Sequence, residues 1–356
     1  MGFLKQINIL ITGAGAPGIA GTIYALKNNP DNVNFRVIST DINDDVVGKF
    51  LSDGFYKIPP PESNDYIQVL EDIALKENIK VILPQTTREI IKLSESKDRF
   101  SNQGIAVVVS SFESIRVAND KYLLLEKARE IGVPYPAYFL ANSIPSLLDA
   151  IKILGYPQKK VVVKPRISSG MRGLRVITNE SWNLKKFLSE KPEGIEINLD
   201  QLLDILKNNE FELLVTEYLP GIEYTIDVFR GKSGVIAIPR IREKIRSGIT
   251  FDAKVVLNSD LINYAMELAK ALDLKYCFGF QFKSSEEGIS KLIEANPRVQ
   301  GTMVVSLFAG FNIIYYSILE ALGYEIDLSR VKLKDNIKFK RYWGGIAIDN
   351  EILGKI

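Results

Sequence analysis

The first third of the chain alternates continuous apolar runs with segments of helical periodicity, and this alternation restricts the possible folds most. The four apolar runs are residues 7–12, 35–40, 81–86 and 105–110. Apolar runs of this kind are typical of parallel strands that are buried on both faces. Residues 18–29 and 65–78 carry apolar side chains at helical spacing. The sequence therefore predicts a doubly wound α/β domain in residues 1–115.

A glycine-rich loop follows the first apolar run. Gly13, Gly15 and Gly18 fit the pattern G-x-G-x-x-G, and Asp41 ends the next run. In dinucleotide enzymes this pattern gives a tight turn, a helix N-terminus for the pyrophosphate and an acidic contact to a ribose. An NAD(P)-dependent oxidoreductase is therefore one interpretation. In the other, the glycines serve close packing, and the loop around Gly15 offers its helix N-terminus to a substrate carboxylate.

Beyond residue 115 the pattern changes to short strands and hairpins. Asn119 and Asp120 can cap a helix, which the sequence GVPYP would end. Residues 159–178 are predicted to form a strand, a glycine-bearing loop and a second strand. Short strands then dominate from residue 212 onward, interrupted by a helix at 259–274. These features predict an α+β body with two antiparallel sheets.

The composition excludes several kinds of chemistry. The chain has no histidine and a single cysteine, Cys277. It therefore has no intrachain disulfide, no Ser–His–Asp triad, no Cys–His pair and no imidazole metal site. Catalysis must use carboxylates, amides, lysine, arginine and backbone dipoles. A bound metal is expected to be hard and held by oxygen, as Mg²⁺ or Mn²⁺ is.

Charge and hydropathy limit the partners. The 45 Lys and Arg residues nearly balance the 43 Asp and Glu residues, which gives no reason to expect nucleic acid or a membrane surface. The N-terminal residues lack a basic region and a cleavage site, so we expect a cytoplasmic protein. Residues 299–319 contain no charged side chain and are long enough to span a bilayer. Because polar residues interrupt them, we interpret them as a buried loop and helix.

Residues 278–298 are predicted to form a hairpin that carries a polar cluster. If its turn centres between residues 287 and 288, the numbers of paired residues sum to 575, and Gln281 lies opposite Glu294. Side chains alternate along a strand, so Asn296 shares the face of Glu294, and Arg298 follows just beyond. One carboxylate and two amide oxygens suit Mg²⁺ that bridges phosphates, and the guanidinium suits a phosphate or an oxyanion. The alternative is a solvated sheet face that ends in a turn.

Two further segments suit a nucleotide. Lys164 ends a strand and precedes a glycine loop, whose N–H groups can close over phosphates. In residues 215–227 a strand edge and a Pro-Gly turn can meet an adenine edge. Leu219 would pack on the ring, and Glu217 or Glu223 would reach the base or ribose. The alternative for this segment is an ordinary strand–turn–strand.

The sequence PQTTRE, at the end of the third apolar run, is a candidate substrate contact. The Thr86 and Thr87 hydroxyls can donate hydrogen bonds, and the Glu89 carboxylate can accept an amine. The alternative is a capped helix start.

The segments VVVKP…SSGMRG, TEYLPGIEYTIDV and FGFQF…LIEANPR, in this order and spacing, resemble the ATP-grasp superfamily. The similarity extends over residues 5 to 323 and is strongest to the synthetase domains of the carbamoyl phosphate synthetase large subunit. It implies a Rossmann-like pre-ATP-grasp domain followed by a two-subdomain ATP-grasp fold, α/β plus α+β. The implied boundaries are 1–115 for the first domain, 116–215 for a lid subdomain, 216–330 for a metal and nucleotide subdomain, and 331–356 for a C-terminal extension.

The resemblance also implies roles for individual residues. Phosphate contacts fall on Lys121 and Lys164, with Ser169 and Gly170 in the covering loop. The implied adenine and ribose contacts are Glu217, Tyr218, Leu219 and Glu223. The implied metal ligands are Gln281, Glu294 and Asn296, of which Gln281 and Glu294 also face the ATP phosphates. Arg298 matches the arginine that steadies an acyl-phosphate intermediate, and Lys244 and Arg246 are candidates for anion binding.

The resemblance implies an ATP-dependent carboxylate–amine ligase with Mg²⁺ or Mn²⁺, possible as a homodimer. The chain contains one synthetase domain rather than the tandem pair, and it lacks the loop histidine of the synthetase. These departures favour a single-module ligase over carbamoyl phosphate synthesis by this chain alone. The alternatives are the NAD(P)-dependent oxidoreductase and a non-catalytic ATP-binding sensor.

Overall fold

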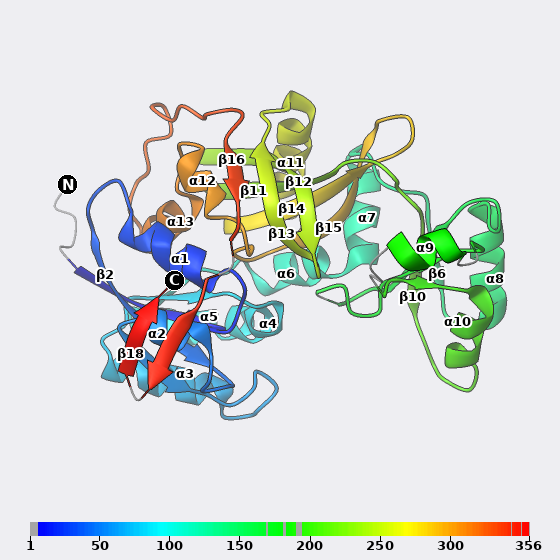
Figure 1. Cartoon of the computed structure of the whole chain (residues 1–356). Helices are drawn as coiled ribbons and strands as arrows, with labels where there is room; N and C mark the ends of the chain where they lie inside the picture. The colour runs from blue at the N-terminus through cyan, green and yellow to red at the C-terminus, as the bar shows by residue number, and fades with distance from the viewer. Residues whose placement is uncertain are drawn as a thin grey trace. The chain divides into compact units, whose positions relative to one another are not determined.

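The computed structural model describes residues 6–168, 170–180, 183–189, 194–342, 344–349 and 351–355 (Figure 1). The chain divides into two compact units. Unit one comprises Met1–Asn119, Tyr224–Gln281 and Ala295–Ile356, and unit two comprises Asp120–Glu223 and Phe282–Glu294. The finer division at residues 115, 215 and 330 remains a prediction.

Unit one begins with the predicted doubly wound domain. Its five-stranded parallel sheet has the order β3-β2-β1-β4-β5. The strands are β1 (Gln6–Thr12), β2 (Asn34–Asp41), β3 (Gly54–Lys57), β4 (Val81–Pro84) and β5 (Ala106–Val107). The helices are α1 (Ile19–Lys27), α2 (Val47–Leu51), α3 (Tyr66–Lys76), α4 (Thr87–Glu95), α5 (Lys97–Ser101) and α6 (Phe112–Asn119). The strand order reverses between β1 and β4, and in such sheets ligands bind beyond the carboxyl ends of the strands at this point.

The two faces of this sheet have separate cores. Ile9 and Ile11 of β1 pack on one face with Ile23 of α1, while Leu10 faces the other core with Leu70 of α3. This arrangement explains the continuous apolar runs, because the side chains of residues 9–12 of β1 and of all of β4 are buried. The edge strand β3 was not predicted, since its four residues are only half buried or exposed.

The uncharged segment of residues 299–319 also belongs to unit one. It forms α12 (Val305–Phe308) and α13 (Ile313–Ala321), and Met303, Ile314 and Ile318 join the core that contains Ile9 and Ile11. The prediction of a buried loop and helix is confirmed. In the part of the chain that the structure describes, no helix is long and apolar enough to cross a membrane.

The glycines of the first loop bring α1 against this segment. An added Cβ at Gly18 would lie 2.9 Å from the Gly301 Cα, and one at Gly21 would lie 3.0 Å from a Val304 methyl group. A side chain at either position would push the helix away. Gly18 and Gly21 therefore allow close packing of α1 on residues 301–304.

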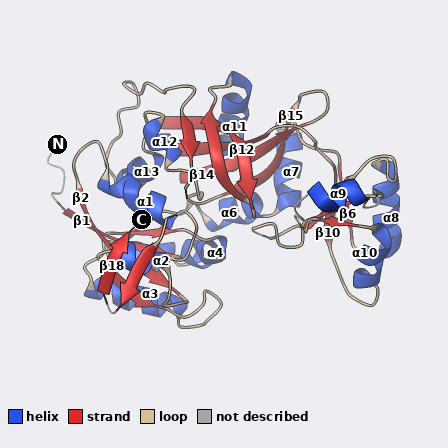
Figure 2. Ribbon diagram, viewed as in Figure 1, coloured by secondary structure: helices blue, strands red, loops and turns tan. Residues whose placement is uncertain are grey.

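A six-stranded sheet has the order β15-β14-β11-β12-β13-β16 (Figure 2). Its strands are β11 (Glu223–Gly231), β12 (Gly234–Arg246), β13 (Ile249–Val255), β14 (Tyr276–Ser284), β15 (Ser290–Asn296) and β16 (Lys338–Lys340). Within unit one, β11 pairs antiparallel with β12, β12 with β13, and β13 with β16. Helix α11 (Ser259–Ala271) follows β13. Cys277 of β14 is buried in the same core as Phe229 and Ile238. Two further strands, β17 (Ile346–Asp349) and β18 (Glu351–Lys355), form a separate antiparallel pair.

Unit two contains a five-stranded sheet of order β6-β10-β7-β8-β9. The strands are β6 (Tyr138–Ala141), β7 (Val161–Pro165), β8 (Arg175–Ile177), β9 (Glu196–Ile197) and β10 (Leu213–Glu217), and the helices are α7 (Lys121–Glu130), α8 (Ile144–Ile153), α9 (Leu184–Ser189) and α10 (Leu199–Leu206). The predicted hairpin is confirmed by antiparallel pairing of Val161 with Ile177. The expectation of a purely antiparallel sheet is wrong here, because β8 and β9 are parallel. Asp120 caps α7, as predicted, by accepting from the Tyr122 and Leu123 N–H groups at 2.9 and 3.2 Å.

The glycine contact between α1 and residue 301 can be tested from both sides. Gly18→Ala places a methyl group against a backbone atom and should lower the free energy of unfolding by about 1–3 kcal/mol. Gly301→Ala is the matched control, because its Cβ meets only the Gly18 nitrogen at 3.9 Å. Urea denaturation of both variants measures the difference, and equal stabilities would contradict the packing role.

Candidate functional site

Two buried lysines face one carboxylate in unit two. Lys164, near the end of β7, is 5% exposed, and its Nζ donates to the Ile293 carbonyl at 3.4 Å. Burial lowers the pKa of Lys164 to about 8, the positive charge of Lys121 lowers it as well, and Glu294 opposes both. Burial lowers the pKa of Lys121 as well, and the Glu294 carboxylate partly opposes this shift. Two ammonium groups beside one carboxylate leave a positive charge that an anionic ligand can neutralise.

The glycine loop after β7 is anchored at its base. The Lys121 N–H donates to the Arg166 carbonyl at 3.0 Å, and the Lys121 Nζ donates to the Ser168 carbonyl at 2.8 Å. The Arg166 guanidinium binds both oxygens of Asp120, with Nη2 at 2.6 Å from Oδ2 and Nε at 3.2 Å from Oδ1. Helix α7 and the start of the loop are therefore one hydrogen-bonded body. Such an anchor fixes where the loop begins.

Further along this loop, the backbone requires glycine. Gly170 has φ +63°, and Gly173 has φ +75°, where an added Cβ would lie 2.6 Å from the Pro165 ring. Ser169, predicted to cover phosphates, lies outside the described residues. The part that Gly170 would take in phosphate binding remains a prediction.

The predicted adenine-side residues lie at the end of β10 in unit two. Glu217 Oε1 accepts from the Ala137 N–H at 2.8 Å and from Lys291 Nζ at 2.5 Å. The Lys283 ammonium lies 5.5 Å from the centre of the Tyr218 ring, and Leu219 is buried. Glu223 begins β11. Contacts of these four residues to a base or ribose remain predictions.

The hairpin between β14 and β15 differs from its expected form at the loop. The Ser285 N–H donates to the Ile289 carbonyl at 2.9 Å, and the Ser284 and Ser290 hydroxyls are 3.3 Å apart. Paired numbers at this end therefore sum to 574, not 575. Gly288 has φ +83°, which gives a three-residue loop with a left-handed glycine in place of a two-residue turn.

The predicted metal ligands come from both units. Gln281 and Asn296 belong to unit one and Glu294 to unit two, so their meeting around one cation remains a prediction. Their donor chemistry, one carboxylate and two amides, suits Mg²⁺ or Mn²⁺. Among the residues that the structure describes, no group of three or more Asp, Glu or Cys side chains could hold a metal.

Arg298 links the start of α4 to the end of β15. Its Nε donates to the Thr87 hydroxyl at 2.9 Å, its Nη1 to the Val299 carbonyl at 2.8 Å and its Nη2 to Asn296 Oδ1 at 3.1 Å. Thr87 is the first residue of α4, and Asn296 is the last residue of β15. The guanidinium plane is thus fixed by a residue that the sequence had suggested as a substrate contact.

Glu89 holds the start of α4 against the end of β1. Its Oε2 accepts from the Thr12 hydroxyl at 2.9 Å and from the Thr86 hydroxyl at 2.8 Å. Burial of the side chain, which is 5% exposed, raises the pKa of Glu89 to about 6, and the charge of Asp41 adds to this effect. These bonds fit a helix start that is tied to the neighbouring strand. A contact of Glu89 to a substrate amine remains a prediction.

Asp41 accepts hydrogen bonds from the glycine loop and from the loop that follows β2. Its Oδ2 accepts from the Gly15 N–H at 2.7 Å, and its Oδ1 accepts from the Asn43 N–H at 3.0 Å. A dinucleotide site would use this carboxylate for ribose hydroxyls, whereas here it accepts from two backbone N–H groups. This engagement weighs against the oxidoreductase interpretation.

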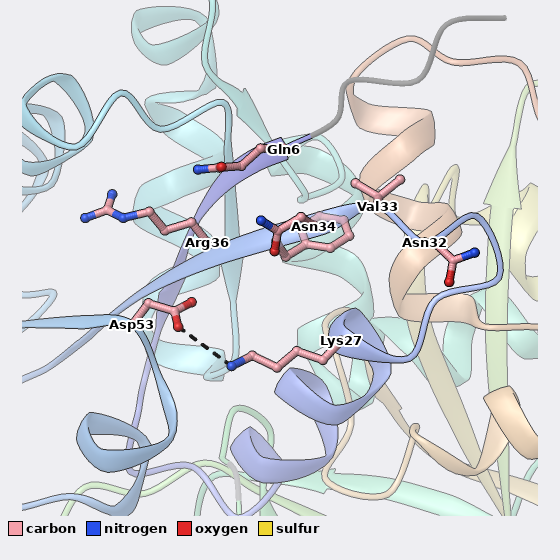
Figure 3. Close-up of a pocket in the computed structure, with 8 residues that line it drawn as sticks. Gln6, Lys27, Asn32, Val33, Asn34, Arg36 and Asp53 are labelled. Carbon is pink, nitrogen blue, oxygen red and sulfur yellow. Dashed lines mark ion pairs between the residues drawn. The ribbon is translucent and has the colours of Figure 1, made fainter.

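A pocket in unit one lies at the amino ends of the strands of the parallel sheet (Figure 3). Its lining residues come mainly from the amino ends of β1 and β2 and include Gln6, Asn34 and Arg36. Lys27 and Asp53 form an ion pair there at 3.7 Å. Thr12 and Asp41 lie at the carboxyl ends of β1 and β2. The pocket is at the other end of these strands and is not part of the candidate site.

The basic side chains of β12 differ in their exposure. Lys244 and Arg246, the predicted anion contacts, are exposed, and the Arg246 guanidinium lies 4.9 Å from the centre of the Phe251 ring. Arg240 of the same strand is buried, and its Nε donates to Asp227 Oδ2 at 2.8 Å.

The comparisons with known proteins cover both parts of the fold. Residues 9–108 match the family described as PylC-like, N-terminal domain, and residues 209–342 match ATP-grasp in the biosynthetic pathway with Ter operon. The carbamoyl phosphate synthase large chain of Clostridium acetobutylicum is 26% identical over 254 residues, which are 65% of this chain and 22% of that protein. The chain thus spans about a fifth of the length of this relative.

Solved structures agree in fold. The N5-carboxyaminoimidazole synthetase of Staphylococcus aureus with ADP has a TM-score of 0.67 at 16% identity, covering 90% of this chain and 78% of that one. The biotin carboxylase domain of the Hydrogenobacter thermophilus 2-oxoglutarate carboxylase, with MgADP and bicarbonate, has a TM-score of 0.68 at 18% identity, covering 93% and 73%. The ATP-grasp family model that matches residues 209–342, the PylC-like match to residues 9–108 and the shared fold together support an ATP-grasp superfamily protein.

Proposed function

We propose that the chain is an ATP-dependent ligase that activates a carboxylate as an acyl phosphate and transfers the acyl group to an amine. The observation that carries this proposal is the pair of buried lysines beside Glu294 in unit two. Burying an ammonium group is costly unless an opposite charge meets it. A triphosphate supplies that charge, and Lys121 lies beside the anchored glycine loop, because its Nζ donates to the Ser168 carbonyl of that loop.

The proposed nucleotide contacts follow the same logic. Lys121 and Lys164 would bind phosphate oxygens, and the loop containing Gly170 would cover them. Glu217, Tyr218, Leu219 and Glu223 would meet the adenine and ribose. Gln281, Glu294 and Asn296 would hold Mg²⁺ or Mn²⁺, which would neutralise charge on the transferring phosphoryl group.

The proposed reaction has two steps. An oxygen of the substrate carboxylate attacks the γ-phosphorus of ATP, the bond to the β-phosphate breaks, and ADP leaves. The amine nitrogen then attacks the acyl carbon, phosphate leaves, and the nitrogen loses a proton. Arg298, oriented by Thr87 and Asn296, would hold the acyl phosphate between the steps. Lys244 and Arg246 are secondary candidates for anion binding.

The comparisons support this proposal at the level of the fold. The Staphylococcus aureus synthetase was solved with ADP, and the Hydrogenobacter thermophilus domain was solved with MgADP and bicarbonate. The carboxylate and amine used by this chain, and a homodimeric assembly, remain predictions.

An ADP-release screen tests the reaction. Carboxylic acids, including amino acids and bicarbonate, are crossed with amines in the presence of Mg-ATP. We expect one combination to raise ADP release above the basal rate, and Glu294→Gln to abolish the increase. ATP binding without stimulated ADP release for any pair would support the sensor interpretation instead.

Lys164 gives a test that does not need the substrate. Phosphate binding favours the charged lysine, so ADP binding at pH 8 should take up protons, because the ligand-free pKa of Lys164 is about 8. Calorimetry in two buffers of different ionisation enthalpy measures this uptake. Lys164→Met should remove it and weaken ADP binding roughly tenfold or more.

The same variant has a predicted effect on stability. Since the folded pKa of Lys164 is lowered, the buried charge destabilises the ligand-free protein below pH 8, and this penalty fades as the pH rises towards the unfolded pKa. Lys164→Met should therefore unfold at an equal or higher temperature at pH 7. Lys160→Met, on the same hairpin but paired with Glu180 and Glu196, is the control and should keep ADP affinity.

Thr87 is expected to act through Arg298. Thr87→Val removes the acceptor for Arg298 Nε, and a lost hydrogen bond to a charged group should lower kcat about tenfold or more, with KM for ATP nearly unchanged. Thr87→Ser keeps the hydroxyl and should restore the rate. Steady-state kinetics on folded variants measures both, and a valine variant as fast as the serine variant would exclude this role.

A further inference from the structure

The last strand of the six-stranded sheet has an open edge. In the described part of the chain, β16 pairs with β13 alone (Figure 1). The Ile337 carbonyl accepts from the Val255 N–H of β13 at 2.9 Å, and the Arg341 N–H donates to a β13 carbonyl at 2.7 Å. Alternate residues of an antiparallel strand direct their backbone groups to opposite sides. The N–H and C=O groups of Lys338 and Lys340 therefore lie on the open side of β16.

The side chains that this segment exposes are mostly basic. Residues 330–340 contain Arg330 and four lysines but a single acidic residue, Asp335, whereas the whole chain has 45 basic and 43 acidic residues. The Asp335 carboxylate accepts from the Leu257 N–H at 3.0 Å. The apolar residues of the segment pack on the core of unit one, and the four lysines are exposed: Lys332, Lys334, Lys338 and Lys340. The segment thus presents one sign of charge to solvent.

Two lysines lie directly opposite each other across β13 and β16. Lys254 is the register partner of Lys338, and Asp252 is the register partner of Lys340. Opposite residues of an antiparallel pair share a face, where like charges are destabilising. Lys340 forms an ion pair with Asp252 at 3.3 Å, but within the described ranges Lys254 and Lys338 form none. A carboxylate from another molecule would offset this charge.

An acidic strand fits both the open edge and the lysines. Strand addition takes affinity from main-chain hydrogen bonds and specificity from alternate side chains. In an antiparallel addition, the residues opposite Lys338 and Lys340 are two positions apart and face the lysines, and the residue between them lies beside half-buried Phe339. The sequence that fits is therefore acidic, apolar, acidic. Nucleic-acid phosphates or lipid headgroups would meet the lysines but could not continue the ladder of backbone hydrogen bonds.

We propose that the open edge of β16 docks an acidic segment of a partner protein by antiparallel strand addition, with Lys254, Lys338 and Lys340 facing its carboxylates. This interaction goes beyond the proposed ligase reaction and does not depend on it. Lysines on an edge strand also keep apolar strands from pairing there. The same charges attract an acidic strand, so the edge is selective rather than closed.

The test measures binding of a labelled peptide to the full chain by fluorescence anisotropy at low and high salt. The probe is an acetylated peptide of alternating glutamate and valine. Methylating its glutamate nitrogens removes the hydrogen bonds to the edge, and methylating its valine nitrogens is the matched control, because those N–H groups point away from β16. A lysine–valine peptide, polyuridylate RNA and phosphatidylglycerol vesicles are the other arms.

The protein variants reverse charge at the edge or elsewhere. Lys338→Glu combined with Lys340→Glu alters the edge. Lys80→Glu combined with Lys232→Glu is the control, because it changes the net charge equally at exposed positions of unit one. All four side chains are exposed, so the thermal unfolding temperature and ADP binding should stay unchanged. If the edge variant fails to fold, Lys338→Gln combined with Lys340→Gln takes its place.

We expect the glutamate–valine peptide to bind more weakly as salt rises, and the edge variant to weaken binding about tenfold or more. The control variant and the valine-methylated peptide should bind normally, and the glutamate-methylated and lysine–valine peptides poorly. The proposal is overturned if the peptide does not bind, if both methylated peptides bind alike, or if the control variant loses as much affinity. Tighter binding of RNA or vesicles than of the peptide would also overturn it.

Discussion

The burial of two ammonium groups beside one carboxylate is the interaction on which the rest of the site depends. Lys121 and Lys164 are held in place by the capped start of α7 and by β7, so the protein itself bears the electrostatic cost before any ligand arrives. Groups that are placed in advance need little reorganisation during a reaction. The fold of unit two therefore holds the Lys121 and Lys164 ammonium groups in fixed positions.

Unit one also holds a charged side chain in a fixed position, and it does so through helix packing and hydrogen bonds. Gly18 allows α1 to approach Gly301, and Glu89 ties the start of α4 to β1. Thr87, at that helix start, orients Arg298. The segment that orients Arg298 is thus fixed by packing in the parallel-sheet domain. This domain can in this way position the arginine to which the proposed function assigns the acyl phosphate.

Much of this architecture was predictable from local patterns. The central strands, α1, α3, α7 and the hairpin around Lys164 were predicted because period, capping and glycine placement agree there. The short strands β3, β6, β9 and β16 were not, since two to four half-exposed residues carry no clear period. The turn at Gly288 was shifted by one residue, because a two-residue and a three-residue loop share the same glycine signal.

The position of Cys277 has a practical consequence. The only thiol of the chain is enclosed in the core of β14, and burial raises its pKa, so it is poorly reactive toward alkylating reagents. A cysteine introduced at exposed Ile167, at the base of the glycine loop, would be the single accessible labelling position. A fluorophore attached there would show whether the loop moves when a nucleotide is added, without first removing a native cysteine.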